Sequence, residues 1–258
     1  LNISYQSAGF DGRYIYCAPG YKGKYSVTAL LPDYTGERGD SGAVLRYDTT
    51  RSLKDPGSYA VYDAGDTSGL NARTYDGVVF DGRYMYFVPL EPLGVVLRYD
   101  THGDFQAPDS WVAHYYNAAA TQAMGKCVGA TFDGRYIYFC PYAGDSIAVR
   151  YDTSRGFTDP GSWEARDVGG TDGLATIGYD GAFFDGRYVY YVPFWKGETL
   201  HGGFHGEFLR YDSTRPFRDP AAWCAVDAGN TDGLGTSGFT AGAFEGRFLY
   251  CAPWRVAV

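Results

Sequence analysis

The sequence predicts an all-β protein, a five-bladed β-propeller of four-stranded antiparallel blades whose fifth blade is incomplete within this chain. Three observations predict this fold: the composition, five ordered recurrences of one short string, and a tight-turn signal inside these recurrences. The chain has 258 residues, of which 36 are Gly and 18% are aromatic. Such a composition suits short strands joined by tight turns, and no long apolar stretch with a helical period interrupts it.

Three short strings recur in a fixed order along the chain. The first is Phe-Asp-Gly-Arg-Tyr, with Phe-Glu-Gly-Arg-Phe as its last copy, and its copies begin at Phe10, Phe80, Phe132, Phe184 and Phe244. The second is Arg-Tyr-Asp, which begins at Arg46, Arg98, Arg150 and Arg210. The third is Pro-x-x-Trp or Pro-x-x-Tyr, which ends at Tyr59, Trp111, Trp163 and Trp223. Recurrence in an unchanged order indicates a repeat architecture.

Each repeat is expected to contain four short strands, here called a to d. In the fourth repeat they cover residues 181–184, 187–192, 207–212 and 223–227. The pair Asp185-Gly186 between the first two strands is a strong hairpin signal. Four antiparallel strands per repeat are typical of a propeller blade. We therefore expect one domain over 1–258, with units of about 8–76, 77–128, 129–180, 181–240 and 241–258.

The ends of the chain fall inside repeats. Leu1-Asn2 aligns with Leu70-Asn71, ahead of a strand a, and Val256–Val258 aligns with the start of a strand c. Four repeats are therefore full and the fifth is about half present. In architecture alone, without shared motif residues, the chain resembles five-bladed propellers such as tachylectin-2-type lectins and arabinanase-like glycoside hydrolases. The latter use acids placed once each on different blades, and no matching pattern is found here.

Charge and composition disfavour several function classes. The net charge of -8 disfavours a nucleic-acid partner bound through a basic face. No run of eighteen apolar residues is present, so no membrane-spanning segment is expected. We expect no cofactor, because the sequence has no phosphate loop and no nucleophile motif. The five cysteines show no CxxC spacing, leave at least one thiol unpaired in any disulfide scheme, and leave the compartment open, secretion included.

The loops predict which end of the blades is functional. The a–b and c–d connections are nearly constant between repeats, whereas the b–c loops vary in length, and binding residues concentrate on variable loops. We therefore expect the face that carries the b–c and d–a loops to bind ligand. Three b–c loops there place an aromatic residue before a cation: Tyr21-Lys22, Trp195-Lys196 and Trp254-Arg255. Such pairs can bind sugars, or they can pack the loops on the blade below.

Other candidates on this face are polar. Asp172 and Asp232 occupy matching d–a loops, where they can line a pocket or cap their own turns. The long b–c loop of the fourth repeat holds Glu198, His201 and His205. Their spacing matches no zinc motif, and glycines make a helix there unfavourable, so we expect no metal site. The Arg, Asp and Tyr residues that recur in every repeat are expected to build the scaffold by turn capping, ion pairing and Arg–Tyr stacking.

Three functions remain open. The first is a ligand-binding module for a carbohydrate or another small polar ligand. The second is a glycoside hydrolase or lyase with carboxylates in the central channel, for which candidates are Asp33, Glu37, Asp40, Glu91, Asp145 and Glu198. The third is a structural or interaction module of a longer protein or assembly. In that case a partner strand can complete the fifth blade, because an unfinished blade exposes a strand edge.

Overall fold

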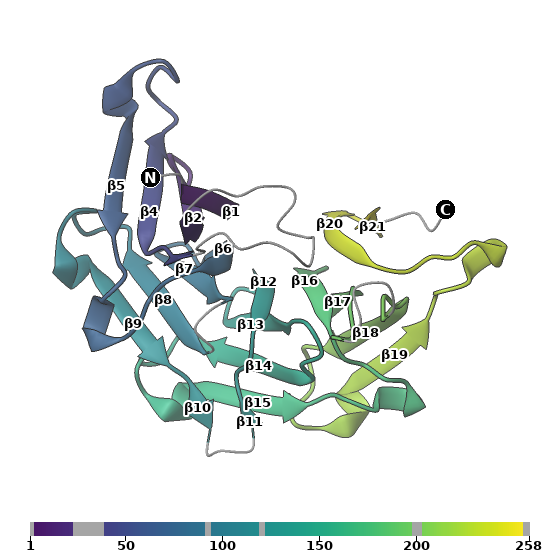
Figure 1. Cartoon of the computed structure of the whole chain (residues 1–258). Helices are drawn as coiled ribbons and strands as arrows, with labels where there is room; N and C mark the ends of the chain where they lie inside the picture. The colour runs from purple at the N-terminus through teal and green to yellow at the C-terminus, as the bar shows by residue number, and fades with distance from the viewer. Residues whose placement is uncertain (1–2, 23–38, 91–93, 119–121, 198–202, 255–258) are drawn as a thin grey trace. The chain divides into compact units, whose positions relative to one another are not determined.

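The computed structural model describes residues 3–22, 39–90, 94–118, 122–197 and 203–254. Every regular element in these ranges is a β-strand or a single turn of 3-10 helix, which confirms the predicted all-β fold of propeller-type blades. The chain forms two compact units, Leu1–Tyr115 and Tyr116–Val258. We call them the N-terminal and the C-terminal unit, and Figure 1 labels their strands.

The N-terminal unit contains two antiparallel blades. Blade 1 has the strand order β1 (Ile3–Phe10), β2 (Tyr14–Lys22), β4 (Ala43–Asp48) and β5 (Tyr59–Asp63), with the short β3 (Gly39–Asp40) paired to β2. Blade 2 has the order β6 (Tyr75–Phe80), β7 (Tyr84–Pro89), β8 (Val95–Asp100) and β9 (Trp111–Tyr115). The first strands of the two blades, β1 and β6, contact each other, and one core of buried aromatic and aliphatic side chains joins the blades.

The C-terminal unit contains two more blades and a hairpin. Blade 3 has the order β12 (Cys127–Phe132), β13 (Tyr136–Pro141), β14 (Ile147–Asp152) and β15 (Trp163–Asp167). Blade 4 has the order β16 (Tyr179–Phe184), β17 (Tyr188–Pro193), β18 (Glu207–Asp212) and β19 (Trp223–Asp227). The hairpin consists of β20 (Phe239–Glu245) and β21 (Phe248–Pro253), and a small separate pair consists of β10 (Asn117–Ala118) and β11 (Gln122–Ala123). Strands c and d of blade 4 match the prediction residue for residue.

The repeated Asp-Gly pair makes the hairpin turn that the sequence predicts. In blade 4, Asp185 Oδ1 accepts hydrogen bonds from the backbone N–H groups of Arg187 and Tyr188, at 2.8 and 2.6 Å. Its other oxygen accepts from the Tyr190 hydroxyl at 2.8 Å. Gly186 has φ +102°, a conformation that favours glycine. One carboxylate therefore closes the turn and fixes a side chain of the next strand.

An arginine then joins the start of strand b to strand c by an ion pair with an aspartate, a contact that we call the latch. Arg187 donates two hydrogen bonds to Asp212, with Nη2 to Oδ2 at 2.7 Å, and its guanidinium lies over the Tyr188 ring. Arg210 covers the same ring, with its Cζ 4.2 Å from the ring centre. The same Arg–Asp latch occurs as Arg13–Asp48, Arg83–Asp100 and Arg135–Asp152. The prediction that these recurring residues build the scaffold is confirmed.

A buried tryptophan fixes the outer strand of three blades. The indole N–H of Trp111, Trp163 and Trp223 donates to the carbonyl of a phenylalanine six residues earlier, at 2.9 to 3.0 Å. In blade 1, Tyr59 replaces the tryptophan, and its hydroxyl donates to the Leu53 carbonyl at 2.8 Å. Because the donor is satisfied, a large amphipathic ring can be buried without an unpaired polar atom. The aromatic residue that ends the third repeated string therefore fixes strand d to the core of its blade.

Candidate functional site

The predicted site residues are distributed over both units. Glu198, His201 and Arg255 lie outside the described residues. In the N-terminal unit, Tyr21 is buried and belongs to strand β2 itself, and its backbone N–H donates to Ser4 Oγ of β1 at 2.9 Å. Lys22 is the last residue of β2. The other predicted residues, Trp195, Lys196, His205, Trp254, Asp172 and Asp232, belong to the C-terminal unit.

An aromatic row follows the b–c side of the C-terminal unit. It consists of Tyr142, Phe194 and Trp254, the residues that directly follow the last proline of β13, β17 and β21. Each donates its backbone N–H to a residue ahead of its blade's first strand: Lys126, Gly178 and Gly238, at 2.9 to 3.1 Å. The Tyr142 and Phe194 rings stack at 5.8 Å, and Trp254 meets Phe194 edge-on at 6.2 Å.

The strand register corrects one detail of the sequence alignment. Pro193 pairs with Tyr179 and Pro253 with Phe239, each the first residue of its strand a, so Trp254 is equivalent to Phe194. Trp195 lies one residue further along its loop and donates its backbone N–H to the Gly178 carbonyl as well. The aromatic–cation pairs Trp195-Lys196 and Trp254-Arg255 are therefore not at equivalent positions. Trp195 instead pairs its backbone with Phe204 across the b–c loop of blade 4, and Phe204 packs against Phe194 at 5.3 Å. Trp254, half exposed, is the open end of the row.

Lys196 and His205 are engaged in a polar network beside this row. Lys196 Nζ lies 2.9 Å from Glu207 Oε2, and both side chains are largely buried. His205 Nδ1 accepts from the Glu207 backbone N–H at 3.3 Å, and Nε2 lies 2.9 Å from the Gly178 carbonyl, which assigns the proton to Nε2. Burial lowers the pKa of His205 below its ordinary value, so the ring is neutral at pH 7. These residues hold the loop together.

Asp172, one of the two d–a aspartates, has a role that neither sequence interpretation anticipated. Asp172 has φ 53° in a 3-10 turn, and its Oδ2 accepts from the Ala225 backbone N–H of the next blade, at 2.8 Å. Ser68 does the same in the N-terminal unit, with Oγ 3.1 Å from the Ala113 nitrogen. The residue at this position therefore joins neighbouring blades through one hydrogen bond, and we call it the peg. Asp232 has the same backbone conformation, at φ 55°.

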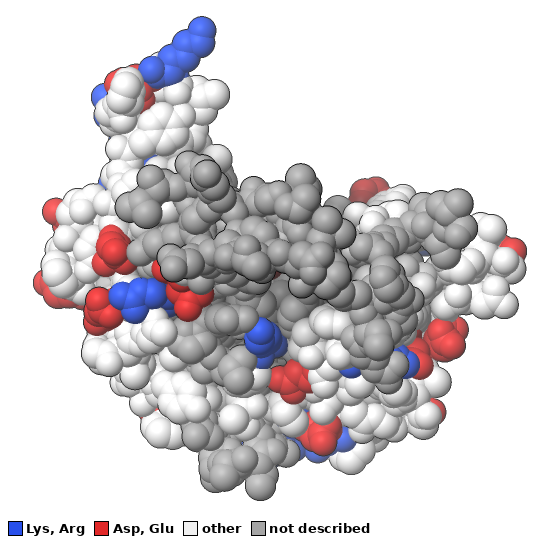
Figure 2. Space-filling view, viewed as in Figure 1, with Lys and Arg blue, Asp and Glu red and all other residues white. Residues whose placement is uncertain are grey.

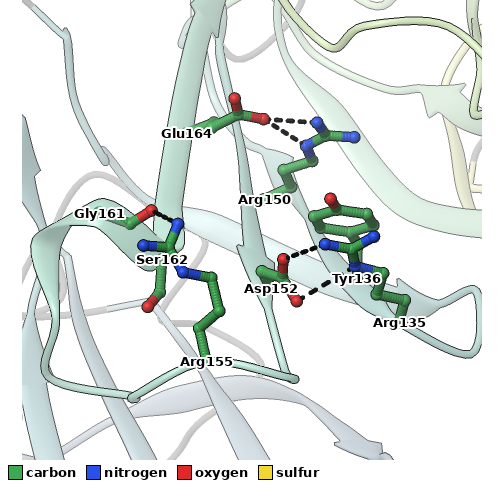
Figure 3. Close-up of a pocket in the computed structure, with 8 residues that line it drawn as sticks. All are labelled: Arg135, Tyr136, Arg150, Asp152, Arg155, Gly161, Ser162 and Glu164. Atoms are coloured by element: carbon green, nitrogen blue, oxygen red, sulfur yellow. Dashed lines mark hydrogen bonds and ion pairs between the residues drawn. The ribbon is translucent and has the colours of Figure 1, made fainter.

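A charged pocket lies on blade 3, on the side of the a–b and c–d turns (Figure 3). Its volume is about 190 Å³, and its charged lining is already paired. Arg135 binds Asp152, Arg155 donates to the Gly161 carbonyl, and Arg150 binds Glu164 with Nε to Oε2 at 2.6 Å. Arg135 and Asp152 are the latch of this blade, and Tyr136 and Arg150 recur in every full blade, so this pocket follows from scaffold chemistry.

A larger pocket lies in the N-terminal unit, between the d–a turn of blade 1 and the outer strand of blade 2. Its volume is about 370 Å³, and its lining includes Tyr62, Asp63, Asp66, Thr67, Ser68 and Trp111. Tyr62 stacks on Trp111 at a centroid distance of 4.8 Å and an interplanar angle of 12°. The carboxylates are exposed, and Asp66 pairs with Arg73 Nη2 at 2.9 Å. An aromatic ring, carboxylates and hydroxyls therefore share one pocket.

Sequence reasoning did not select this pocket. Strand d has a position that changes in every blade, occupied in turn by Tyr62, His114, Arg166 and Val226. Tyr62 is the aromatic member of that series, which is the signal that could have found it. The pocket itself depends on two blades meeting, and a comparison of repeats along the chain does not show which loop lies over which neighbouring strand.

Two carboxyl groups elsewhere have raised pKa values. Burial raises the pKa of Asp76, on the first strand of blade 2, to about 6. Burial also raises the pKa of Asp145, whose Oδ1 accepts from the Ile147 backbone N–H at 2.9 Å. Asp40 accepts from the Thr74 hydroxyl at 3.1 Å. Asp33, Glu37, Glu91 and Glu198 lie outside the described residues.

Charge and metal-binding groups are dispersed over the described part of the chain. Figure 2 shows Lys and Arg interspersed with Asp and Glu on the viewed face. Within the described ranges, no three His, Cys, Asp or Glu side chains gather as a metal site would require. No helix in those ranges is long and apolar enough to cross a membrane. All five cysteines are unpaired.

Comparison with known proteins establishes the fold. No family model matches the sequence, and no curated protein matches it. Among solved structures, the chain is similar to PorZ, a bacterial surface component of the type-IX secretion system of Porphyromonas gingivalis, with a TM-score of 0.57 and 10% identity over 93% of this chain. The chain spans 29% of the length of that PorZ chain. It is also similar to a chain of a mitotic checkpoint complex, with a TM-score of 0.51 and 12% identity, covering 99% of this chain and 78% of the other. Both have β-propeller-type folds.

Proposed function

We propose that the chain is a ligand-binding module whose ligand is a carbohydrate, bound in the pocket between blades 1 and 2. The observation that carries this proposal is the combination of Tyr62 with Asp63 and Asp66 in a pocket of about 370 Å³. Small-molecule sites are typically about 300–1,000 Å³ and combine apolar walls with a few placed polar groups. Tyr62 and Asp63 end strand β5, and Asp66 belongs to the d–a turn, which is on the face where the sequence predicts binding.

The chemistry of the lining suits sugars. An aromatic ring packs on the apolar face of a sugar ring, and Tyr62 is held in place by its stack on Trp111. Sugar hydroxyls donate hydrogen bonds, and carboxylates accept them strongly. Asp63 and Asp66 supply such acceptors at the exposed rim. The Ser68 hydroxyl, which accepts from the Ala113 nitrogen at 3.1 Å, still has its own proton to donate.

A glycan-binding screen of the intact chain tests the proposal. Tyr62→Ala should weaken binding by about tenfold, because ring stacking contributes about 0.5–1.5 kcal/mol beyond buried area. Tyr115→Ala is the matched control, because Tyr115 is an exposed tyrosine of strand β9 in the same unit and does not line the pocket. If no glycan binds, or if both variants bind as the parent does, the pocket is not a carbohydrate site.

The same glycans and variants of the chain distinguish hydrolysis from binding alone. A glycoside hydrolase uses two carboxyl groups about 5–10 Å apart, and Asp63 and Asp66 line one pocket. The glycans that bind should be recovered uncleaved, as judged by mass spectrometry after prolonged incubation. If a glycan is cleaved and Asp63→Asn abolishes this cleavage, the pocket is a catalytic site and not a binding site alone.

A further inference from the structure

Within the described ranges, one edge of strand β21 has no neighbouring strand, whereas strand b of every full blade pairs with strand c along that edge. In blade 4, strand b pairs with strand a on one side and with strand c on the other, through Tyr188–Tyr191. Within the described ranges, β21 pairs with β20 alone. The equivalent residues Phe248–Cys251 therefore present backbone donors and acceptors on one side. Such a row is a template for pairing with another strand.

Arg247 occupies the position of the latch arginines, and within the described ranges no strand c supplies an aspartate to it. Its Cζ lies 5.1 Å from the centre of the Phe248 ring, as Arg187 lies 4.7 Å from that of Tyr188. Arg187 uses this orientation to bind Asp212 of strand c with two hydrogen bonds. The same pairing occurs in all four full blades. Arg247 thus lies over the neighbouring ring as the latch arginines do, without the aspartate of a strand c among the described residues.

Asp232 occupies the position from which its equivalents accept a hydrogen bond from a backbone N–H of the next blade's outer strand. Its equivalents Asp172 and Ser68 each accept from the third residue of the following blade's strand d, Ala225 and Ala113, at 2.8 and 3.1 Å. Asp232 has φ 55° and ψ 26°, and Asp172 has φ 53° and ψ 25°. The loop is therefore held in the conformation that carries the peg, on the side of blade 4 that faces the next blade.

Several apolar side chains of blade 4, its d–a loop and β21 are exposed. Leu234, Phe248 and Tyr250 are 67%, 51% and 60% exposed. Leu70, the equivalent of Leu234, packs on the core of the N-terminal unit. Val226 is 59% exposed, whereas its equivalent Tyr62 stacks on the tryptophan of the next strand d. Single exposed apolar residues are common, but Phe248 and Tyr250 lie next to each other on the strand whose edge is unpaired within the described ranges, with ring centres 6.2 Å apart, and exposed apolar groups at such an edge mark an interaction surface.

We infer that this surface binds a two-stranded polypeptide hairpin with the chemistry of the chain's own strands c and d. The hairpin supplies an Arg-Tyr-Asp string, whose aspartate pairs with Arg247 and whose arginine covers Phe248. Its outer strand supplies a backbone N–H to Asp232 and a tryptophan to Val226. Each group on the surface meets the partner that its equivalent has in the full blades. The mode is β-strand addition, with a charge pair fixing the register.

The test adds such a hairpin to the intact chain. The probe is a synthetic peptide with the sequence of residues 207–228 and Ala in place of Cys224, used both free and tethered by a flexible linker after Val258. Tethering raises its effective concentration to about the millimolar range, so weak pairing is still detected. Binding of the free peptide is measured by fluorescence anisotropy. Docking of the tethered form is measured by amide hydrogen exchange of β21, which should slow by about tenfold or more.

A double-mutant cycle identifies the contact. Asp212→Asn in the peptide should weaken binding by about tenfold, because charge-assisted hydrogen bonds are stronger than neutral ones. The same change should have little effect when the chain carries Arg247→Gln, since the partner is then absent. Arg218→Gln, at another exposed arginine of the same unit, is the control and should retain full binding.

Three results would overturn the inference. One is the absence of exchange protection in the tethered form. Another is equal binding of a scrambled peptide. The third is self-association of the chain, seen by sedimentation velocity, that Arg247→Gln abolishes and that excludes the peptide, because the occupant of the edge would then be a second copy.

Discussion

Replacing Asp76 by Asn should stabilise the N-terminal unit at alkaline pH and leave it unchanged in acid. Burial raises the pKa of Asp76 from 3.8 to about 6 in the folded chain. The folded state therefore binds this proton more tightly than the unfolded state does. The stability that the protonated carboxyl contributes is present in full below the unfolded pKa, and it is lost as pH rises through about 6. Each pKa unit corresponds to about 1.4 kcal/mol, so ionisation costs about 3 kcal/mol.

The assay compares parent and variant at two pH values. Urea unfolding followed by amide exchange of β6–β9 reports the N-terminal unit. Asp76→Asn should raise its free energy of unfolding by up to about 3 kcal/mol near pH 8 and by little near pH 4. Asp109→Asn, at an exposed position of the same unit, should change it by less than about 0.5 kcal/mol at both. An Asp76→Asn effect that is the same at the two pH values, or destabilising near pH 8, would refute the burial argument.

Two further substitutions use pairs of repeats as internal controls. Asp172→Ala should destabilise the C-terminal unit by about 1–3 kcal/mol more than Asp232→Ala in thermal unfolding. Both residues have positive φ, but among the described residues only Asp172 accepts a hydrogen bond from the next blade. Equal losses of stability in the two variants would mean that the peg contributes nothing. Gly178→Ala should destabilise far more than Gly173→Ala, since φ is +75° and +79° but only at Gly178 would a Cβ collide with the Trp195 carbonyl. Circular dichroism melts measure both, and similar melting temperatures for the two glycine variants would contradict the close approach of that loop.

The parts of the fold that could be predicted are those encoded within one blade. The Asp185 turn and the Arg187–Asp212 latch each use residues of a single repeat, so their recurrence in the sequence is sufficient to find them. The strands follow because they lie between these fixed points.

The contacts between blades could not be predicted in the same way. The alignment of Trp254 with Trp195 was one residue out of step, because it matched side-chain types and not the position after the proline that ends strand b, where blade 4 has Phe194. The pocket around Tyr62 was missed for a related reason, since two of its seven lining residues, Pro108 and Trp111, come from the next repeat. Asp172 was assigned to its own turn or to a ligand, whereas its partner is Ala225, more than fifty residues away.

The division between latches within blades and pegs between them has a consequence for cooperativity. A chain of repeats whose neighbours interact is described by an intrinsic free energy for each unit and a coupling free energy for each junction. The Arg–Asp latch belongs to the first quantity, and the peg at Ser68 or Asp172 belongs to the second. Substitutions at pegs should therefore broaden the unfolding transition by allowing blades to melt one at a time. Substitutions at latches should shift the midpoint and leave the transition sharp.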